Sequence, residues 1–502
     1  MSDQLFIGID SGTQGTKGII FSRDEGRILA EEYSEHQLIE NIGGRREQEP
    51  AWWIDACSTV IGRLLKHSSV SQNRICAMGI SGQQHGMVPL DTEGQVIRPA
   101  KLWCDTETAP QCDRITETIG SPAQVIAAIG NSIAAGFTAS KILWLKQHEP
   151  ENYARLKTVL LPHDYLNYWL TGRHTSEFGD ASGTAYFDVK TRSWSEAILN
   201  AIDDSGKLQH CLPELIPPHA PAGTIRPEIA AQFGLSPDVV VSAGGGDNMM
   251  AAIGTGNVAA GVVTTSLGTS GTIYSYSDKP IIDPDGELAA FCSSSGGWLP
   301  LVCTMNVTVS TELTRSMLGC SLEDLNQLAS SARPGAEGIL LLPYFNGERT
   351  PALPNATAGF FGLTSTNYSA ANIARAAMEG ATLGLRYGLE VLKQQGITPT
   401  DIRLVGGGAK SPLWRRIVAD VFDCPVVCPE SPEAGAMGAA LQAMWCHIRL
   451  REGAAEISEL TERYIRLDES TRALPDTSAA AQYEEIYQNY LELNETMKPL
   501  FH

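Results

Sequence analysis

Short apolar runs and amphipathic stretches alternate along the chain, an order typical of an α/β protein. Residues 5–9 and 18–21 are apolar runs separated by a polar, glycine-containing segment, and they predict two paired β-strands. Within residues 52–67, apolar side chains recur at helical spacing. Residues 75–80 indicate a buried strand, and residues 402–427 a strand–helix–strand unit. The pattern therefore predicts a mixed fold in which loops after strands can carry a functional site.

A glycine-rich stretch from Val241 to Thr272 contains the most distinctive chemistry of the chain. Three consecutive glycines, residues 244–246, precede Asp247, so we predict a tight turn that presents one carboxylate where a ligand can approach the backbone. A β-branched run at 262–265 then leads into a loop of glycines and hydroxyl side chains. Backbone N–H groups in such a loop can cradle a phosphate.

The same glycine–threonine frame occurs in both halves of the chain. The two loops are Gly12, Thr13, Gln14, Gly15 and Thr16 in the first half, and Gly268, Thr269, Ser270, Gly271 and Thr272 in the second. Their spacing differs from that of a P-loop and from that of a dinucleotide-binding fingerprint. Because each loop joins two strand-like runs, we predict two related structural units that hold one phosphate-bearing ligand between them.

Two further polar segments follow predicted strands. Gln83, Gln84 and His85 come after the strand at 75–80 and offer neutral donors and acceptors that suit sugar hydroxyls. Residues 406–410 join the first strand of the strand–helix–strand unit to its helix, and their glycines let a flat base or ribose lie against the backbone. A carboxylate, paired phosphate loops and a neutral polar segment together favour phosphoryl transfer.

Two longer motifs give the chain a specific resemblance to a known family. One is G-F-T-A-S-K-I-L-W-L-K-Q-H at 136–148, and the other is G-F-F-G-L at 359–363 followed by N-I-x-x-A-A-M-E at 372–379. On these motifs the chain resembles the FGGY family of carbohydrate kinases over residues 5–447, and within it the xylulokinase members most of all. The resemblance implies an α/β fold of two related actin/hexokinase-type (ribonuclease H-like) domains with an interdomain cleft.

The resemblance also implies domain bounds and a reaction. Residues 1–248 would form a mainly sugar-binding domain with the first phosphate loop, residues 249–450 a nucleotide-binding domain, and residues 451–502 a helical tail. The reaction would be transfer of the γ-phosphoryl group of ATP to the terminal hydroxyl of a ketopentose, D-xylulose. Asp247 would be the catalytic base, and Mg²⁺ would be held by Asp247 and, through water, by Asp10.

The binding residues follow from the same resemblance. The residues expected to bind the sugar are Gln84, His85, Gly86, Asp105, Asp247 and Asn248. Those expected to bind the nucleotide are Gly12, Thr13, Gln14, Gly15 and Thr16, then Gly268, Thr269 and Ser270, and finally Gly407, Gly408, Ala409 and Lys410. Many relatives carry W-x-D-x-R around the position of Asp105, and Glu107 stands here in place of that arginine. One contact to the sugar is therefore lost.

Other functions remain open at this point. Ribulose, a pentitol or another neutral sugar are alternative substrates, and so is gluconate, although residues 83–85 offer no fixed cation for an acidic sugar. An actin-like ATP-driven scaffold or chaperone would also carry paired phosphate loops. Such a protein would need neither Asp247 and Asn248 nor the Gln-Gln-His segment, so sugar-dependent release of ADP separates the two classes.

Charge and composition narrow the partners. The formal net charge of −20, from 37 basic and 57 acidic residues, argues against nucleic acid and anionic membranes. Eleven cysteines at scattered spacings are interpreted as thiols in a reducing compartment rather than as a zinc site. No basic leader followed by an apolar core and no apolar run of about 18 residues is evident. We therefore expect a cytoplasmic protein whose partners are a sugar and ATP; the resemblance is compatible with a homodimer.

Overall fold

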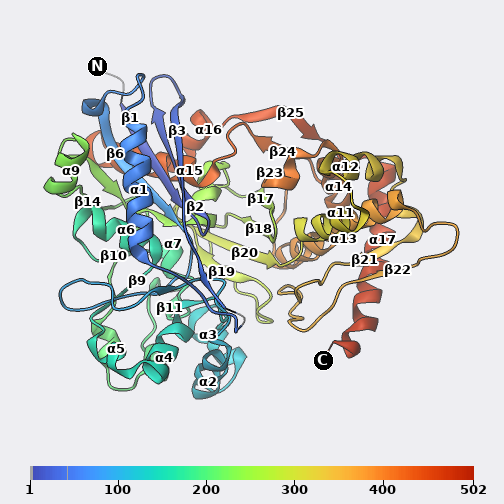
Figure 1. Cartoon of the computed structure of the whole chain (residues 1–502), viewed down its shortest axis with the longest axis horizontal. Coiled ribbons are helices and arrows are strands. Elements are labelled where there is room, and N and C mark those ends of the chain that lie inside the picture. The colour runs from blue at the N-terminus through green and yellow to red at the C-terminus, as the bar shows by residue number, and fades with distance from the viewer. Residues whose placement is uncertain (1–3, 42, 502) are drawn as a thin grey trace. The chain divides into compact units, whose positions relative to one another are not determined.

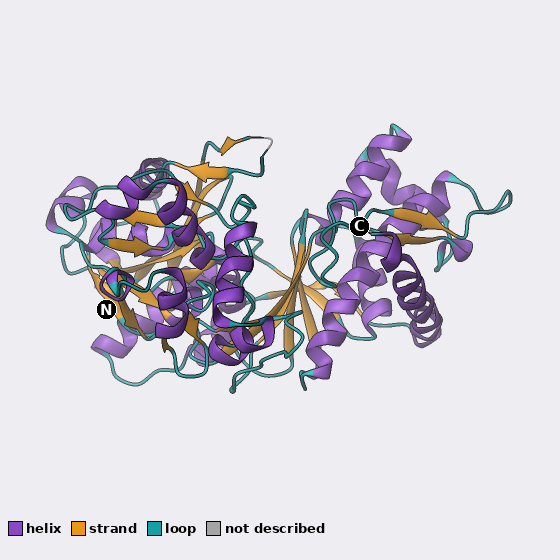
Figure 2. Cartoon of the chain, turned by 90° about the horizontal axis from the view of Figure 1, so that it is seen from below, coloured by secondary structure: helices purple, strands orange, loops and turns teal. Residues whose placement is uncertain are grey.

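The structure is a computed structural model that describes residues 4–41 and 43–501. Two compact units are present: unit 1 comprises Met1–Val258, Ser277–Leu299 and Glu433–Ile465, and unit 2 comprises Ala259–Tyr276, Pro300–Pro432 and Arg466–His502. Each unit has a mixed β-sheet with helices packed on it (Figures 1 and 2).

The sheet of unit 1 has the strand order β14-β15-β6-β1-β2-β3. Strands β1 (Leu5–Ser11), β2 (Gly15–Ser22) and β3 (Arg27–Glu35) form an antiparallel meander, while β6 (Ile75–Gly82) and β15 (Val240–Ser242) run parallel to β1. Strand β14 (Pro221–Thr224) closes the far edge. Because β1, β6 and β15 are parallel, their carboxyl ends lie at one edge of the sheet.

Unit 2 repeats this plan with the order β20-β18-β17-β23-β24-β25. Strand β17 (Val262–Leu267) pairs antiparallel with β18 (Gly271–Ser275), which pairs antiparallel with β20 (Trp298–Thr304). Strands β23 (Asp401–Val405) and β24 (Val426–Pro429) continue parallel to β17, and β25 (Leu467–Ala473) is antiparallel to β24. The loops at 12–16 and 268–272 thus join equivalent hairpins, β1–β2 and β17–β18, as the sequence repeat predicts.

Apolar residues on both faces of the first sheet explain why helices cover both sides. Leu5, Ile7 and Ile9 of β1 belong to a core shared with α1 (Pro50–Leu64) and α6 (Pro162–Thr171), whereas Phe6 points into a second core with α15 (Ala434–Arg451). The side-chain period of two in a strand produces this division. The helices α9 (Pro227–Phe233) and α16 (Ile457–Tyr464) add to the first and second cores, respectively.

Helix α15 packs against β1, β6 and α10 (Asp247–Gly254) at backbone distance. A Cβ placed at Gly438 would lie 1.8 Å from the carbonyl oxygen of Met250, and one placed at Gly435 would lie 2.7 Å from Cγ of Asp10. Both are closer than nonbonded atoms can stand, so glycine is required at these positions. Residues 433–465 therefore complete unit 1, although they follow most of unit 2 in the sequence.

Unit 2 is built around the long helix α13 (Ala370–Gln394). Its N-cap is Ser369, whose side chain accepts a hydrogen bond from the backbone N–H of Asn372. The strand–helix–strand unit is present as β23, α14 (Pro412–Phe422) and β24, with Ser411 as N-cap and Pro412 at the first helical position. The predicted C-terminal helix, α17 (Thr477–Met497), packs on α14 in unit 2. The expected bounds of 1–248, 249–450 and 451–502 thus differ from the two compact units.

The remaining elements are short. In unit 1 they are β4 (Ile39–Glu40), β5 (Arg46–Gln48), β7 (Val88–Leu90), β8 (Ala100–Lys101), α2 (Ala109–Ile119), α3 (Pro122–Ile129), α4 (Thr138–His148), α5 (Pro150–Arg155), β9 (Thr158–Leu160), β10 (Thr175–Glu177), α7 (Phe178–Ala181), β11 (Phe187–Asp188), β12 (Ser193–Trp194), α8 (Glu196–Ile202), β13 (Glu214–Ile216), β16 (Gly245–Gly246) and β19 (Ala289–Cys292). In unit 2 they are α11 (Thr308–Leu318), α12 (Leu322–Ser331), β21 (Leu340–Leu342) and β22 (Gly359–Phe361).

One local expectation differs from the structure. Of the three glycines before Asp247, only Gly244 turns the chain, with φ of +71°, whereas Gly245 and Gly246 form β16 and pair with β6.

Two expectations about the whole chain can be compared with the structure. The eleven cysteines are free thiols. Across residues 4–41 and 43–501, no helix combines the length and the apolar character that crossing a bilayer requires.

Candidate active site

Polar residues of unit 1 gather where its parallel strands end. Asp10 is the penultimate residue of β1, Ser81 lies near the end of β6, and Asp247 begins α10 directly after β16. The hydroxyl of Ser81 donates a hydrogen bond of 2.6 Å to Oδ1 of Asp10. The sheet therefore brings together residues far apart in the sequence, as expected for a site beyond the carboxyl ends of parallel strands.

Asp10 and Asp247 form an electrostatically coupled acidic pair. Burial, followed by repulsion from the Asp10 carboxylate, raises the pKa of Asp247 to about 7. The pKa of Asp10 is raised as well, mainly by burial, while the Ser81 hydrogen bond opposes the shift. Two neighbouring carboxyls with raised pKa values fit the two roles expected of them, a proton acceptor and a ligand for a cation.

Asn248 and Gln84 link the acid to the segment after β6. Asn248 donates from its backbone nitrogen (2.7 Å) and from Nδ2 (3.0 Å) to Oδ1 of Asp247. Its Nδ2 also donates to Oε1 of Gln84 at 2.8 Å. The structure thus brings together Asp247, Asn248 and Gln84, three of the residues predicted to bind sugar.

His85 adopts an uncommon backbone conformation beside these residues. Its φ is +63°, in the left-handed region, and its carbonyl accepts hydrogen bonds from Lys141 Nζ (2.7 Å) and Thr138 Oγ1 (3.1 Å). The imidazole packs against Phe137 and Phe291, with ring centroids 4.6 and 5.6 Å away. The sequence predicted a ligand-binding His85 but gave no sign of this backbone geometry.

A buried acidic residue, Asp180 of α7, lies behind Gln84 and His85. Its carboxyl group lies close to the Gln84 side chain and to the backbone N–H of His85, and it is 2.6 Å from Nδ1 of His163. The other ring nitrogen of His163, Nε2, is 3.0 Å from Oδ1 of Asp164. Burial raises the pKa of Asp180 well above its usual value. The sequence did not predict the contacts of His163 with Asp180 and Asp164, because a single histidine in a helix belongs to no recognisable motif.

The first predicted phosphate loop is tied to the same region. Thr13 accepts a hydrogen bond from Trp103 Nε1 (2.9 Å) and donates to Oε1 of Gln83 (3.1 Å). His36 contacts both ends of the loop, with Nδ1 3.1 Å from the Gly12 carbonyl and Nε2 2.8 Å from the Thr16 hydroxyl. Gly12, Thr13 and Gln14 reach the surface, whereas Gly15 and Thr16 are buried at the start of β2. A phosphate role thus suits the first three residues best.

Asp105 is fully buried in a cluster of charged side chains. Its carboxylate accepts hydrogen bonds from Lys101 Nζ (3.1 Å) and from the backbone nitrogens of Arg46 (2.9 Å) and Glu107 (3.1 Å). These contacts favour a structural role over the predicted sugar contact, which stays a prediction. Gly86, also predicted to bind sugar, lies against Pro162: a Cβ there would be 2.6 Å from Pro162 Cγ.

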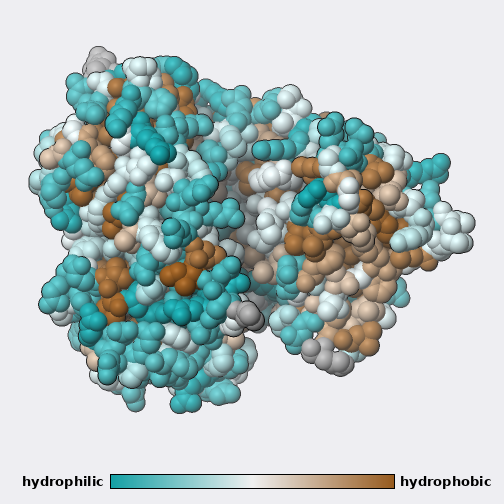
Figure 3. Space-filling model, viewed as in Figure 1, coloured by the Kyte–Doolittle hydropathy of each residue, from teal (hydrophilic) through white to brown (hydrophobic). Residues whose placement is uncertain are grey.

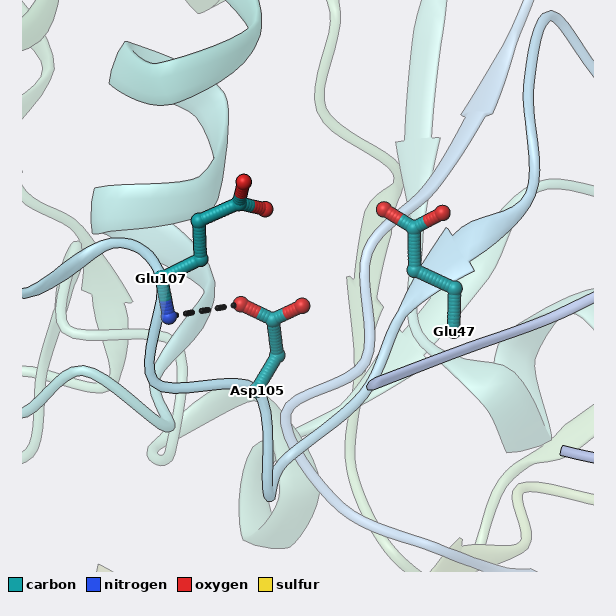
Figure 4. A group of neighbouring side chains, drawn as sticks. All are labelled: Glu47, Asp105 and Glu107. Carbon is teal, nitrogen blue, oxygen red and sulfur yellow. Dashed lines mark hydrogen bonds between the residues drawn. The ribbon is translucent and has the colours of Figure 1, made fainter. Parts of the chain in front are cut away.

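Glu47, Asp105 and Glu107 lie close enough to suggest a metal site (Figure 4). Lys101 Nζ, however, is 3.2 Å from Glu47, 3.1 Å from Asp105 and 2.5 Å from Glu107. Arg98 contacts Glu47 as well, at 2.6 Å. The ammonium group of Lys101 therefore occupies the place that a metal ion would need. Glu107 is one of its ion-pair partners.

Unit 2 contains a pocket of about 1130 Å³ at the predicted nucleotide loops. Thr269 of the second phosphate loop lines it, as do Gly407, Gly408 and Lys410. Ala409 is buried and does not line the pocket, and neither do Gly268 and Ser270. The structure therefore brings part of each predicted nucleotide segment of unit 2 to one cavity.

The other walls of this pocket come from α11 and α12, which the sequence did not indicate. Leu313 and Leu322 supply apolar surface and remain 45% and 63% exposed, and Asn326 adds an amide that accepts a hydrogen bond from Ser411 at 2.6 Å. Hydrophobic side chains gather on the face of unit 2 that carries α11 and α12 (Figure 3). Exposed leucines beside bare glycine backbone suit a flat, partly apolar ligand such as a nucleobase.

Comparison with known proteins agrees with this geometry. The model of the N-terminal domain of the FGGY family of carbohydrate kinases matches residues 5–254, and that of the C-terminal domain matches residues 263–447. A xylulose kinase of Haemophilus influenzae is 46% identical over 491 residues, covering 97% of this chain and 99% of that protein.

Two solved structures extend the comparison. A "xyloylose kinase" from Brucella ovis superposes with a TM-score of 0.92 at 29% identity, covering 99% of this chain and all of that one. A gluconate kinase from Lactobacillus acidophilus has a TM-score of 0.91, covering all of this chain and 99% of that one, but at 24% identity it shows the fold alone.

Tandem ribonuclease H-like sheets with equivalent hairpin loops, and acids at the strand ends, define a phosphotransferase of the actin/hexokinase type. The chain belongs to the FGGY family of carbohydrate kinases. Membership of an enzyme family also sets aside the alternative of an actin-like scaffold or chaperone.

Lys141 should make the stability of the protein depend on pH. Burial lowers the pKa of this fully buried lysine to about 7, from 10.5 in an exposed chain. Between these values the unfolded chain binds a proton that the folded protein does not, so stability rises with pH over this window. Relative to that of Lys141→Met, the free energy of unfolding of the wild type should rise by up to about 1.4 kcal/mol per pH unit from pH 7 to 9.

Urea unfolding of both proteins at pH 7, 8 and 9 measures this gain. Lys146→Met, on the same helix at a half-exposed position, is the matched control for loss of a lysine. A constant difference between wild type and Lys141→Met across this range would contradict the expected pKa of Lys141.

Proposed function

We propose that this protein transfers the γ-phosphoryl group of ATP to D-xylulose, with Mg²⁺ as cofactor, and forms D-xylulose 5-phosphate. The observation that carries the proposal is the 46% identity, over nearly the full length of both chains, with a xylulose kinase. The neutral amides and imidazole around Gln84 and His85 support it, since they match the uncharged hydroxyls of a ketopentose.

In the proposed mechanism Asp247 accepts the proton of the attacking hydroxyl. A pKa of about 7 makes its carboxylate a suitable acceptor near neutral pH. The two hydrogen bonds from Asn248 to Oδ1 fix the orientation of the carboxylate. Gln84, whose Oε1 is bound by Asn248, would hold a sugar hydroxyl next to the base.

Asp10 and Asp247 supply the oxygen ligands that a hard cation prefers. When bound, Mg²⁺ neutralises charge on the phosphates and on these acids. Gly12, Thr13 and Gln14 in unit 1 and Thr269 in unit 2 would contact the phosphates. Gly407, Gly408 and Lys410 would hold the nucleoside in the pocket of unit 2, together with Leu313 and Leu322. The expected roles of Gly15, Thr16, Gly268, Ser270, Ala409, Gly86 and Asp105 remain predictions.

Gluconate is the less favourable substrate on electrostatic grounds. A sugar carboxylate bound near Gln84 would lie among buried groups, where burial already raises the pKa values of Asp180 and Asp247, and the same loss of hydration would penalise its charge. Ribulose and pentitols lack this penalty, so the position of their hydroxyls would decide between them and xylulose. A homodimer remains a prediction from the family resemblance.

A panel of substrates tests the proposed specificity. We expect D-xylulose to give the highest kcat/KM, with values for glycerol and gluconate at least about a hundredfold lower. A ligand whose hydroxyls do not match the site leaves some of its buried hydrogen-bonding side chains without a partner, which costs binding energy. A coupled assay of ADP release with each sugar measures this. Turnover of gluconate or glycerol at the rate of xylulose would contradict the proposed substrate while leaving the kinase assignment intact.

Replacing Asp247 by asparagine should abolish most sugar phosphorylation. We expect kcat to fall by about a hundredfold or more, because the amide cannot accept the hydroxyl proton. ATP affinity and the unfolding midpoint should change little. Asp238→Asn, the same change at an exposed aspartate of unit 1, is the control and should retain full activity. Retention of more than a tenth of the wild-type rate by Asp247→Asn would refute the assignment of the base.

The nucleotide pocket is tested by adding one methyl group at Gly407. A Cβ there has no protein atom within 4 Å, so the alanine fits the folded chain and can clash only with a ligand. We expect Gly407→Ala to raise KM for ATP at least about fivefold, with KM for the sugar unchanged. Gly62→Ala is the matched control, since a Cβ at that helical position also meets nothing within 4 Å. Equal KM values for ATP in both variants would contradict the proposed contact between Gly407 and the nucleotide.

A further inference from the structure

The backbone of His85 is held in a conformation that this residue would not adopt by itself. A left-handed φ, here +63°, costs about 1–2 kcal/mol for a residue with a β-carbon, so its surroundings must stabilise it. A glycine at position 85 would adopt this φ without the cost. A histidine at this position therefore indicates a use for the side chain that justifies the strain.

Buried side chains bind the backbone carbonyl of His85. Its carbonyl oxygen accepts from Lys141 Nζ (2.7 Å) and Thr138 Oγ1 (3.1 Å), two residues one turn apart at the start of α4. The carboxyl group of Asp180 on α7 lies beside its N–H. Thr138, Lys141 and Asp180 have no exposed surface. The peptide group that follows the His85 Cα is thus fixed by two buried side chains of α4.

Lys141 is itself immobilised by a second hydrogen bond. Its Nζ donates to the Gly136 carbonyl at 2.5 Å, so the amino group bridges two backbone oxygens. A neutral amine has two hydrogens and an ammonium three, and either form can make both bonds. The bridge therefore persists whether or not the lysine is charged, and its function does not depend on titration.

The same surroundings fix the direction of the imidazole. The ring lies against Phe137, the residue preceding α4, and against Phe291 of β19. A Cβ at Gly183 would lie 2.1 Å from Cε1 of His85, so the absence of a side chain there makes room for the ring. The hydrogen bonds to the carbonyl thus restrain the backbone, and Phe137, Phe291 and Gly183 restrain the ring.

We propose that Lys141 and Thr138 are positioning residues that hold His85 in its left-handed conformation and thereby direct its imidazole to the sugar. The inference rests on the proposed function, since it assumes that His85 contacts the substrate. It also gives the motif at 136–148 a role beyond helix packing: its threonine and lysine support the sugar-binding segment.

A double-mutant cycle between Lys141 and His85 tests the inference. Lys141→Met keeps the length of the side chain and removes its donors. We expect kcat/KM for D-xylulose to fall at least about tenfold, mainly through KM for the sugar, with KM for ATP unchanged. In a His85→Gly background the same substitution should cost less than about threefold, because glycine adopts a positive φ unaided and has no ring to direct.

Equal losses in both backgrounds would overturn the inference, since Lys141 would then act through something other than His85. Lys141→Gln, which retains a donor amide, should recover part of the loss. Thr138→Val and Thr138→Ser provide a second pair should Lys141→Met fail to fold. Valine removes the bond to His85 and should raise KM for the sugar, whereas serine should behave as wild type. Wild-type behaviour of Thr138→Val and Lys141→Met would also refute the inference.

The failure of the inference can be told apart from that of the proposed function. If the wild type phosphorylates no sugar of the panel, the proposed function fails, and kinetics no longer test the positioning. A crystal structure of Lys141→Met, or of Thr138→Val, then tests it directly. A φ of His85 that leaves the left-handed region supports the inference, and an unchanged φ overturns it.

Discussion

Close packing of helix α15 is the constraint on which the acidic site depends. Gly438 lets α15 approach the backbone of α10, the helix that begins with Asp247, and Gly435 leaves room for the carboxylate of Asp10. One helix without bulky side chains at these points thus sets the positions of both acids. Burial of Asp247 and, after it, repulsion from Asp10 raise the pKa of Asp247, which links backbone packing to the chemistry of the site.

The segment that we propose to bind the sugar, residues 83–85, depends on a different kind of support, a buried polar network. Asp164, His163 and Asp180 lie in contact behind Gln84, which binds Asn248, which in turn binds Asp247. Buried polar groups are costly unless they are paired, so each member limits the conformations open to the next. Such a network stabilises the fold less than apolar packing would, but it specifies one arrangement of the polar side chains.

The sequence predicted the elements better than their contacts. The equivalent hairpins around residues 12–16 and 268–272 and the strand–helix–strand unit depend on local patterns, and both are present. Other features depend on contacts between distant segments. They are the place of Lys101 among three acidic residues, the contact of His163 with Asp180, and the walls that α11 and α12 form around the pocket proposed for the nucleotide. A single sequence carries no local signal for these. Asp105 illustrates the difference: its motif indicated a sugar ligand, while its buried contacts are those of a structural ion pair.

The discontinuity of unit 1 has a consequence for how the protein is made. Residues up to 258 leave the ribosome well before residues 433–465, which include α15 and complete the same unit. At about 5–20 residues per second, synthesis of the intervening segment takes roughly 10 to 35 seconds. During this time the apolar faces of β1 and α10 that α15 later covers lack their partner, and a chaperone that shields them would prevent aggregation. The acidic site is thus among the last parts of the enzyme to form during translation.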